Sequence, residues 1–161
     1  MKEGLILKKL MNKLLPRNIN NNYTGYKFAK YFFYALTALT LWRSQHHLFA
    51  ADGGAQSIAT IPLDTFTKAG AATVIGIFSL WGLSQLIIGI LYLITSLRYR
   101  SMIPLMYLLM FVEYLVRATY IPAFKPITTV GTAPGAVGNI PLIVLSLIML
   151  IFSLLTPKVK N

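Results

Sequence analysis

The sequence contains no cysteine among its 161 residues. Disulfides, thiol chemistry, cysteine-ligated iron–sulfur clusters and covalently attached c-type haem are therefore excluded. Histidine is almost as scarce. Its two occurrences, His46 and His47, point about 100° apart on a helix, so they cannot bind opposite faces of one haem. Because no motif for zinc, nucleotide phosphates or a serine nucleophile is present, we predict no metal site, no cofactor and no catalytic residue.

Charged residues make up only 12% of the chain, about half their share in soluble domains, while hydrophobic residues make up 56%. The hydrophobic residues gather in four stretches, over residues 28–50, 69–97, 101–121 and 137–156. About 20 apolar residues cross the roughly 30 Å hydrocarbon layer of a membrane. A soluble core is the alternative, but so short a chain has too little polar surface to cover four apolar helices. The sequence predicts an all-α integral membrane protein with a four-transmembrane-helix bundle over residues 28–156.

The basic residues concentrate on one side of this predicted bundle. Eleven of the fifteen Lys and Arg lie before or in the first turn of the first stretch, between the second and third, or after the fourth. The positive-inside rule places both termini in the cytoplasm, with residues 157–161 as a basic cytoplasmic tail. This topology and contact with anionic lipids explain the formal net charge of +11, so no binding to nucleic acid is predicted.

Residues 1–16 show the pattern of a basic amphipathic helix that lies in the inner membrane interface. Its two faces differ in character: Leu7, Leu10, Met11 and Leu14 on one side, Lys2, Lys9 and Lys13 on the other. Lysines interrupt the apolar run too early for a cleavable signal peptide. Pro16 ends the helix, and the Asn-rich residues 17–27 are predicted to be a linker. We favour a membrane anchor over a partner-binding arm.

Ionisable residues lie at matching depths in two of the predicted spans. Arg43 lies roughly 22 Å along the first span, and His46 and His47 follow at i+3 and i+4 on the same face. Glu113 and Arg117 lie roughly 18 and 24 Å along the third span and share one face. The sequence therefore predicts a polar cluster near the outer surface.

Two interpretations of this cluster stay open. In one, Glu113 and Arg117 form an internal ion pair, and Arg43 extends to the lipid head groups. In the other, the cost of about 2.5–3.5 kcal/mol for a charge in mid-membrane indicates that these residues line an outward-facing pocket. Trp81 and Gln85 of the second span are candidates for its floor, but we favour helix packing as the role of these two residues. If Glu113 and Arg117 form an isolated pair, we expect Glu113→Gln to harm the protein less than Arg117→Ala, because Arg117 can reach the head groups unaided.

Glycine and proline predict further details. Gly82 and Gly89, a heptad apart in the second span, predict the close approach of a neighbouring helix. The stretch Asp64-Thr65-Phe66-Thr67 is expected to provide the N-cap of the second span, and Pro141 to lie in the first turn of the fourth. The Pro- and Gly-rich residues 122–138 are expected not to form a regular helix.

The chain resembles the DoxX-like group of small four-helix bacterial membrane proteins. The resemblance covers residues 28–156 and rests on the four spans, the loop ending in Asp64-Thr65-Phe66-Thr67-Lys68, the Gly-rich second span over residues 70–89 and the basic hairpin Arg98-Tyr99-Arg100. It implies a location in the bacterial inner membrane. Some members of the group are subunits of quinone-linked oxidoreductases or redox-protective assemblies, without catalytic residues of their own.

We therefore expect a non-catalytic accessory subunit or binding protein with an outward-facing polar pocket for an amphiphile, a lipid or a quinone. The competing class is a membrane enzyme or proton-coupled small-molecule transporter that uses His47 and Glu113. The expected partners are the bilayer with its anionic lipids and either a membrane protein or a second copy of the chain. The candidate binding residues are Arg43, His46, His47, Gln85, Glu113 and Arg117.

Overall fold

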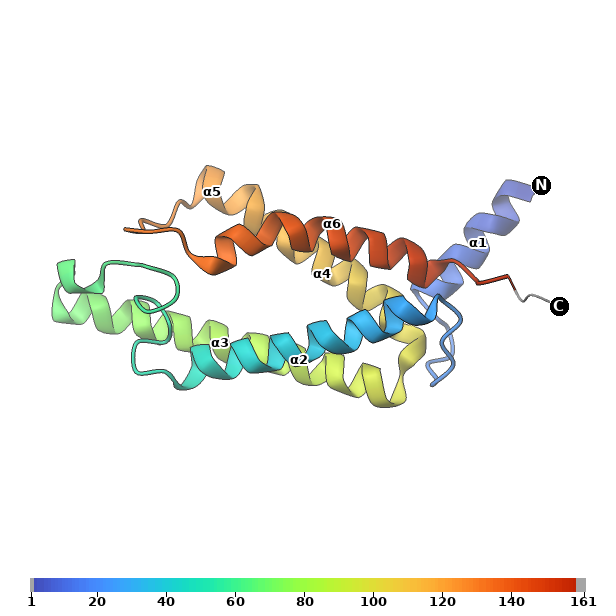
Figure 1. Ribbon diagram of the computed structural model, residues 1–161, viewed down its shortest axis with the longest axis horizontal. Helices are drawn as coiled ribbons and strands as arrows, with labels where there is room; N and C mark the ends of the chain where they lie inside the picture. The colour runs from blue at the N-terminus through green and yellow to red at the C-terminus, as the bar shows by residue number, and fades with distance from the viewer. Residues whose placement is uncertain (1, 159–161) are drawn as a thin grey trace.

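The computed structural model describes residues 2–158, which are all-helical with no strand in this range (Figure 1). Residues 159–161 of the predicted tail lie outside the described part. The helices are α1 (Lys2–Leu14), α2 (Lys27–Phe49), α3 (Lys68–Arg98), α4 (Ile103–Ala118), α5 (Tyr120–Phe124) and α6 (Pro134–Leu154). Short 3₁₀ turns over Leu63–Thr65 and Arg100–Met102 complete the secondary structure.

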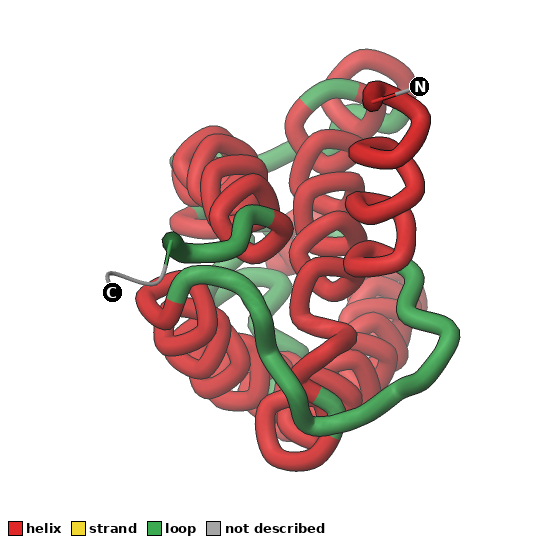
Figure 2. Tube along the Cα trace, turned by 90° about the vertical axis from the view of Figure 1, so that its right-hand side faces the viewer, coloured by secondary structure: helices red, strands yellow, loops and turns green. Residues whose placement is uncertain are grey.

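Helices α2, α3, α4 and α6 lie side by side along one long axis (Figure 1). Helix α2 packs chiefly against α3, and α4 chiefly against α6, so the bundle consists of two helix pairs. At one end, here called the basic end, lie α1, the α3–α4 connection and the last turn of α6. Figure 2 looks onto this end, where the loop after α1 passes across the bundle. The opposite end, the loop end, carries residues 50–67 and 125–133.

Three helical stretches of the described chain are long and apolar enough to cross a membrane: Lys68–Arg98, Arg100–Phe124 and Pro134–Leu154. The structure is therefore consistent with a multi-pass membrane protein. Helix α2 is not among them, because it contains several threonines and tyrosines, Arg43 and both histidines.

The two helix pairs meet in an aromatic core. The ring of Phe33 in α2 lies 5.6 Å from the ring of Tyr92 in α3 and 5.6 Å from that of Tyr107 in α4. The Tyr107 hydroxyl donates a hydrogen bond of 2.6 Å to the Ala29 carbonyl oxygen. All three rings are almost completely buried, so this core fixes the position of one pair against the other.

Glycines allow α2 and α3 to approach closely, as the sequence predicts. A Cβ atom at Gly82 would lie 2.7 Å from the backbone nitrogen of Leu48, and one at Gly89 would lie 2.9 Å from Leu41 Cδ2. Contacts this short are not tolerated between real side chains, so a larger residue at either position requires movement. Gly76 of the same helix differs, since nothing lies within 4 Å of its Cβ position.

The structure selects one residue of the predicted cap stretch and corrects two other details. Thr67 caps α3: its hydroxyl accepts a 3.1 Å hydrogen bond from Gly70 N–H, while Asp64 lies in the preceding 3₁₀ turn. Helix α6 begins at Pro134, whose fixed φ suits a first turn. Pro141 therefore lies inside the helix, and residues 134–138 are helical despite their glycines.

The loop after α2 is folded against α3. The Asp52 carboxylate accepts hydrogen bonds from the backbone N–H groups of Gly54, Gln56 and Ser57, at 2.8, 3.1 and 2.7 Å. Partial burial alone would raise the pKa of the Asp52 carboxyl. The hydrogen bonds outweigh this effect and hold the pKa below its ordinary value. The loop thus depends on a single charged acceptor for much of its local order.

Thr60 connects this loop to the second helix pair. Its carbonyl oxygen accepts a 2.9 Å hydrogen bond from Val130 N–H, and its hydroxyl donates at 2.9 Å to the Gly131 carbonyl oxygen. Thr60 has φ 57°, a left-handed conformation that is uncommon outside glycine. These two bonds link the loops of the two helix pairs at the loop end.

Candidate functional site

A hydrogen-bonded network crosses between the two helix pairs toward the loop end. Arg43 of α2 donates from Nη2 to Gln85 Oε1 of α3 at 3.3 Å. Gln85 in turn donates from Nε2 to Glu113 Oε1 of α4 at 3.2 Å, and Arg117 donates to the same Glu113 oxygen at 3.4 Å. Four of the six candidate residues therefore lie in one network, here called the Arg–Gln–Glu–Arg network.

Helical spacing explains the α4 side of this network. Glu113 and Arg117 are four residues apart and lie on one helical face, so their side chains meet without any tertiary constraint. Their side chains are 27% and 23% exposed, which makes the pair only partly accessible. Gln85 is almost fully buried, because it faces inward between α3 and α4. Gln85 thus carries the connection across the helix pairs.

Trp81, one turn before Gln85, supports both arginines. The guanidinium carbon of Arg117 lies 5.4 Å from the Trp81 ring centroid, and that of Arg43 lies 6.0 Å from it. Arg117 also lies 5.7 Å from the Tyr114 ring. Cations placed over aromatic faces are stabilised by the ring quadrupole, and most strongly by tryptophan. The sequence had assigned Trp81 mainly to packing, and its spacing from Gln85 was the signal for this second role.

The network holds more positive than negative charge. Two guanidinium groups share a single carboxylate, that of Glu113. Within the described chain, Arg43 Nε is buried and has no hydrogen-bond partner. A buried donor without a partner costs about 1–3 kcal/mol, so the site favours an additional acceptor or anion.

The two histidines are separated from each other and from Glu113. His47 is buried, with its ring 4.7 Å from Trp81, and its Nδ1 lies 2.9 Å from the Gly53 carbonyl oxygen. His46 lies on the exposed face of α2. The structure therefore places His47 beside the network without a hydrogen bond to it, and places His46 outside it.

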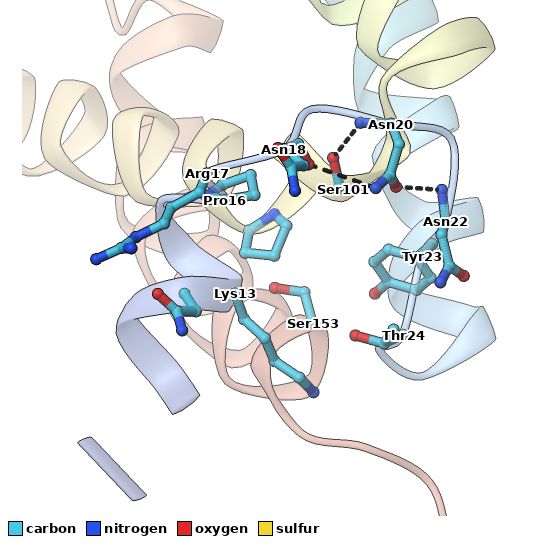
Figure 3. Close-up of a pocket in the computed structure, with 12 residues that line it drawn as sticks. Lys13, Pro16, Arg17, Asn18, Asn20, Asn22, Tyr23, Thr24, Ser101 and Ser153 are labelled. Atoms are coloured by element: carbon cyan, nitrogen blue, oxygen red, sulfur yellow. Dashed lines mark hydrogen bonds between the residues drawn. The ribbon is translucent and has the colours of Figure 1, made fainter. Parts of the chain in front are cut away.

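Two cavities of the structure lie elsewhere in the bundle. One of about 240 Å³ lies between α2 and α3, lined mainly by apolar side chains with Tyr34 and Arg100 at its margin. The other, of about 320 Å³, lies at the basic end and is lined by residues of α1, the linker, α4 and α6 (Figure 3). The sequence identified this linker only as a connection, because segments that are distant in the chain form the cavity together.

The network is suited to holding a polar group rather than to moving protons. It offers guanidinium and amide donors around one carboxylate, and that carboxylate is already engaged by two partners.

Comparison of the chain with models of protein families, with curated proteins and with solved structures finds no match to any of them.

Proposed function

We propose that this chain is a four-span protein of the bacterial inner membrane that binds the polar head of an amphiphile at the Arg–Gln–Glu–Arg network. It acts as a binding protein or accessory subunit, not as a catalyst. The DoxX-like resemblance agrees with this proposal in topology and class. Because no family matches, the proposal depends on the chemistry of the network and on the arrangement of the helices.

The surface of α2 supports its assignment as the fourth span. Its buried positions include the polar residues Thr37, Thr40 and Ser44, whereas Leu39 and Trp42 are exposed. A helix that turns its polar side chains inward and its apolar side chains outward is suited to lipid and unsuited to water. The low mean hydropathy of α2 therefore comes in part from its inner face, while the exposed polar residues Gln45 and His46 lie in its last two turns, near the loop end.

The length of α3 indicates the depth of the network. Its 31 residues span about 46 Å, more than the roughly 30 Å of the hydrocarbon layer. If Arg98 marks the inner boundary, the outer boundary falls about 20 residues earlier, near Phe78. The preceding turns are covered by the folded loop, which packs on Val74, Ile75 and Phe78. Trp81 and Gln85 then lie just inside the outer boundary, where the polar head of an amphiphile would enter.

The unpartnered Arg43 nitrogen is the single observation that carries the binding proposal. A carboxylate, phosphate or quinone carbonyl beside it would satisfy this donor and balance the surplus charge. The proton-handling alternative needs His47 and Glu113 to cooperate, yet His47 bonds the Gly53 carbonyl while Glu113 bonds Gln85 and Arg117. The contacts therefore favour binding over proton transfer.

Tryptophan fluorescence provides the test, because the chain has only two tryptophans. In a Trp42→Phe background, Trp81 is the single reporter and lies within the network. Decylubiquinone and a brominated fatty acid, both quenchers, are titrated into the purified protein in detergent. We expect saturable quenching by at least one of them, weakened about tenfold by Arg43→Gln. Arg98→Gln, at the other end of α3, is the matched control. Quenching that does not saturate, or that Arg43→Gln leaves unchanged, would reject the proposal.

The absence of cysteine makes the topology equally testable. Gln56→Cys and Tyr99→Cys each introduce the only thiol of the chain, on opposite sides of the proposed bundle. An impermeant maleimide added to intact spheroplasts should label position 56 and not position 99. Labelling of both positions from the same side would contradict the four-span arrangement.

A further inference from the structure

The cavity at the basic end is a second candidate binding site, far from the Arg–Gln–Glu–Arg network. Its volume of about 320 Å³ falls within the range of small-molecule sites. Four asparagines contribute to its lining, together with the basic residues Lys13 and Arg17, and no carboxylate of the described part of the chain does. Such a lining provides many hydrogen-bond donors and a positive field, which suit an anionic group rich in acceptors.

The linker forms a fixed wall of this cavity. Asn20 exchanges two hydrogen bonds with Ser101 in the 3₁₀ turn before α4: Asn20 N–H donates to Ser101 Oγ at 3.0 Å, and Ser101 N–H donates to the Asn20 carbonyl at 3.2 Å. The Asn20 side chain accepts from Asn22 N–H at 2.9 Å. Ser101 Oγ acts as an acceptor here, so its own hydrogen is free to point toward a ligand.

Lys13 is held at the opposite wall. Its ammonium group donates to the Leu154 carbonyl at 2.7 Å and to Thr156 Oγ1 at 2.6 Å. An ammonium group has three N–H donors, so one remains after these two bonds. Burial and the neighbouring Lys9 lower the pKa of Lys13, and an anion in the cavity would oppose both effects. Figure 3 shows Arg17 extending outward from the rim, where it attracts a ligand without enclosing it.

The position of α1 indicates where the ligand comes from. Leu5, Ile6 and Leu7 are exposed although they are apolar, as expected for a helix that lies in a membrane surface. The cavity at the end of α1 then opens at the depth of the lipid head groups. We propose that it binds the phosphate ester of an anionic phospholipid head group, with Lys13, Ser101 and the linker amides as direct donors. This inference depends on the membrane placement proposed above and is independent of the ligand at the network.

Lipid binding to the purified protein, measured by native mass spectrometry from detergent, tests the inference. The probes are phosphatidylglycerol, phosphatidylcholine as the zwitterionic comparison, and glycerol 3-phosphate as the soluble phosphate ester. We expect preferential retention of phosphatidylglycerol, reduced about tenfold by Lys13→Gln and less by Arg17→Gln. Lys8→Gln is the matched control: it removes one exposed charge from the same helix, at a residue that does not line the cavity.

Three other outcomes would contradict the inference. Equal losses for Lys13→Gln and Lys8→Gln would show attraction by surface charge alone, and equal retention of the two lipids would show that the cavity holds only water. Tight binding of glycerol 3-phosphate that depends on Lys13 would assign the site to a soluble ester. Asn20→Ala keeps both bonds between the residue 20 backbone and Ser101, so we expect this second variant to fold. Quenching of Trp81 should be unchanged in all these variants, which separates this site from the one at the network.

Discussion

Replacing Gly82 by alanine is expected to push α3 away from α2 and to disrupt the polar network. The new Cβ would lie 2.7 Å from Leu48 N and 2.8 Å from the His47 carbonyl carbon, whereas ordinary contacts begin at 3.4 Å. Both atoms belong to the α2 backbone, so no side chain can turn aside. The helices must separate locally by the difference, about 0.7 Å.

The separation reaches the network because Gln85 lies one turn from Gly82 on the same face. The hydrogen bond from Arg43 to Gln85 is already 3.3 Å long, and an increase of this size takes it beyond the range of a hydrogen bond. Overpacking a tight interface costs about 1–3 kcal/mol. For a chain of this length, that lowers the unfolding temperature by about 2–12 °C.

Gly76→Ala is the matched control. It makes the same chemical change in the same helix, at a position with nothing within 4 Å of the Cβ atom. Both variants gain the helix propensity of alanine, about 1 kcal/mol, so their difference isolates the packing cost. Gly89→Ala should fall between them, because its Cβ meets the flexible end of Leu41.

Thermal unfolding of the three variants in matched detergent, followed by helical circular dichroism, measures these effects. The expected order of unfolding temperatures is Gly76→Ala highest, Gly89→Ala intermediate and Gly82→Ala lowest. If Gly82→Ala were as stable as Gly76→Ala, α2 and α3 would not be in backbone contact at this level, and the argument for the network geometry would fail with it.

Two further predictions concern charged residues. Glu113→Gln should lower the unfolding temperature more than Arg117→Gln. The first variant leaves two guanidinium groups without an anion, whereas the second leaves the charges of Arg43 and Glu113 balanced through Gln85. The double variant should recover part of the loss of the Glu113→Gln variant. Equal losses in the single variants would show that Arg43 does not belong to the network. The loop after α2 should keep its order down to about pH 4 and lose it at lower pH. The pKa of Asp52 is lower in the folded loop than in the unfolded chain, so its stabilising effect is complete above the unfolded-state pKa and disappears as the pH falls through the folded-state pKa. Hydrogen exchange at Ser57 N–H measures this, and Asp52→Asn should show fast exchange at every pH; protection retained in that variant would assign the order of the loop to its apolar contacts.

The sequence determined the helices and the local relations within them. Apolar runs of about 20 residues define α3, α4 and α6 closely, because hydropathy and length depend on consecutive residues. The pairing of Glu113 with Arg117 and the close approach at Gly82 and Gly89 also follow from helical spacing. Which residue of the stretch 64–67 caps α3, and which proline begins α6, did not follow, because several residues suit each position.

Only the tertiary structure decided which helices are neighbours and how each is rotated. In a membrane, the outer faces of all apolar helices would meet the same lipid, so hydropathy carries no information on lateral order, which depends on detailed packing. The Phe33, Tyr92 and Tyr107 core and the glycine contacts set the rotation that turns Arg43 toward Gln85 and leaves His46 outside. As a result, Arg43 joins the Glu113 network, and we expect the opposite order of effects at Glu113 and Arg117 from the one that an isolated pair predicts. The basic-end cavity has the same origin, because Lys13, Ser101 and Ser153 meet only when α1, α4 and α6 pack together.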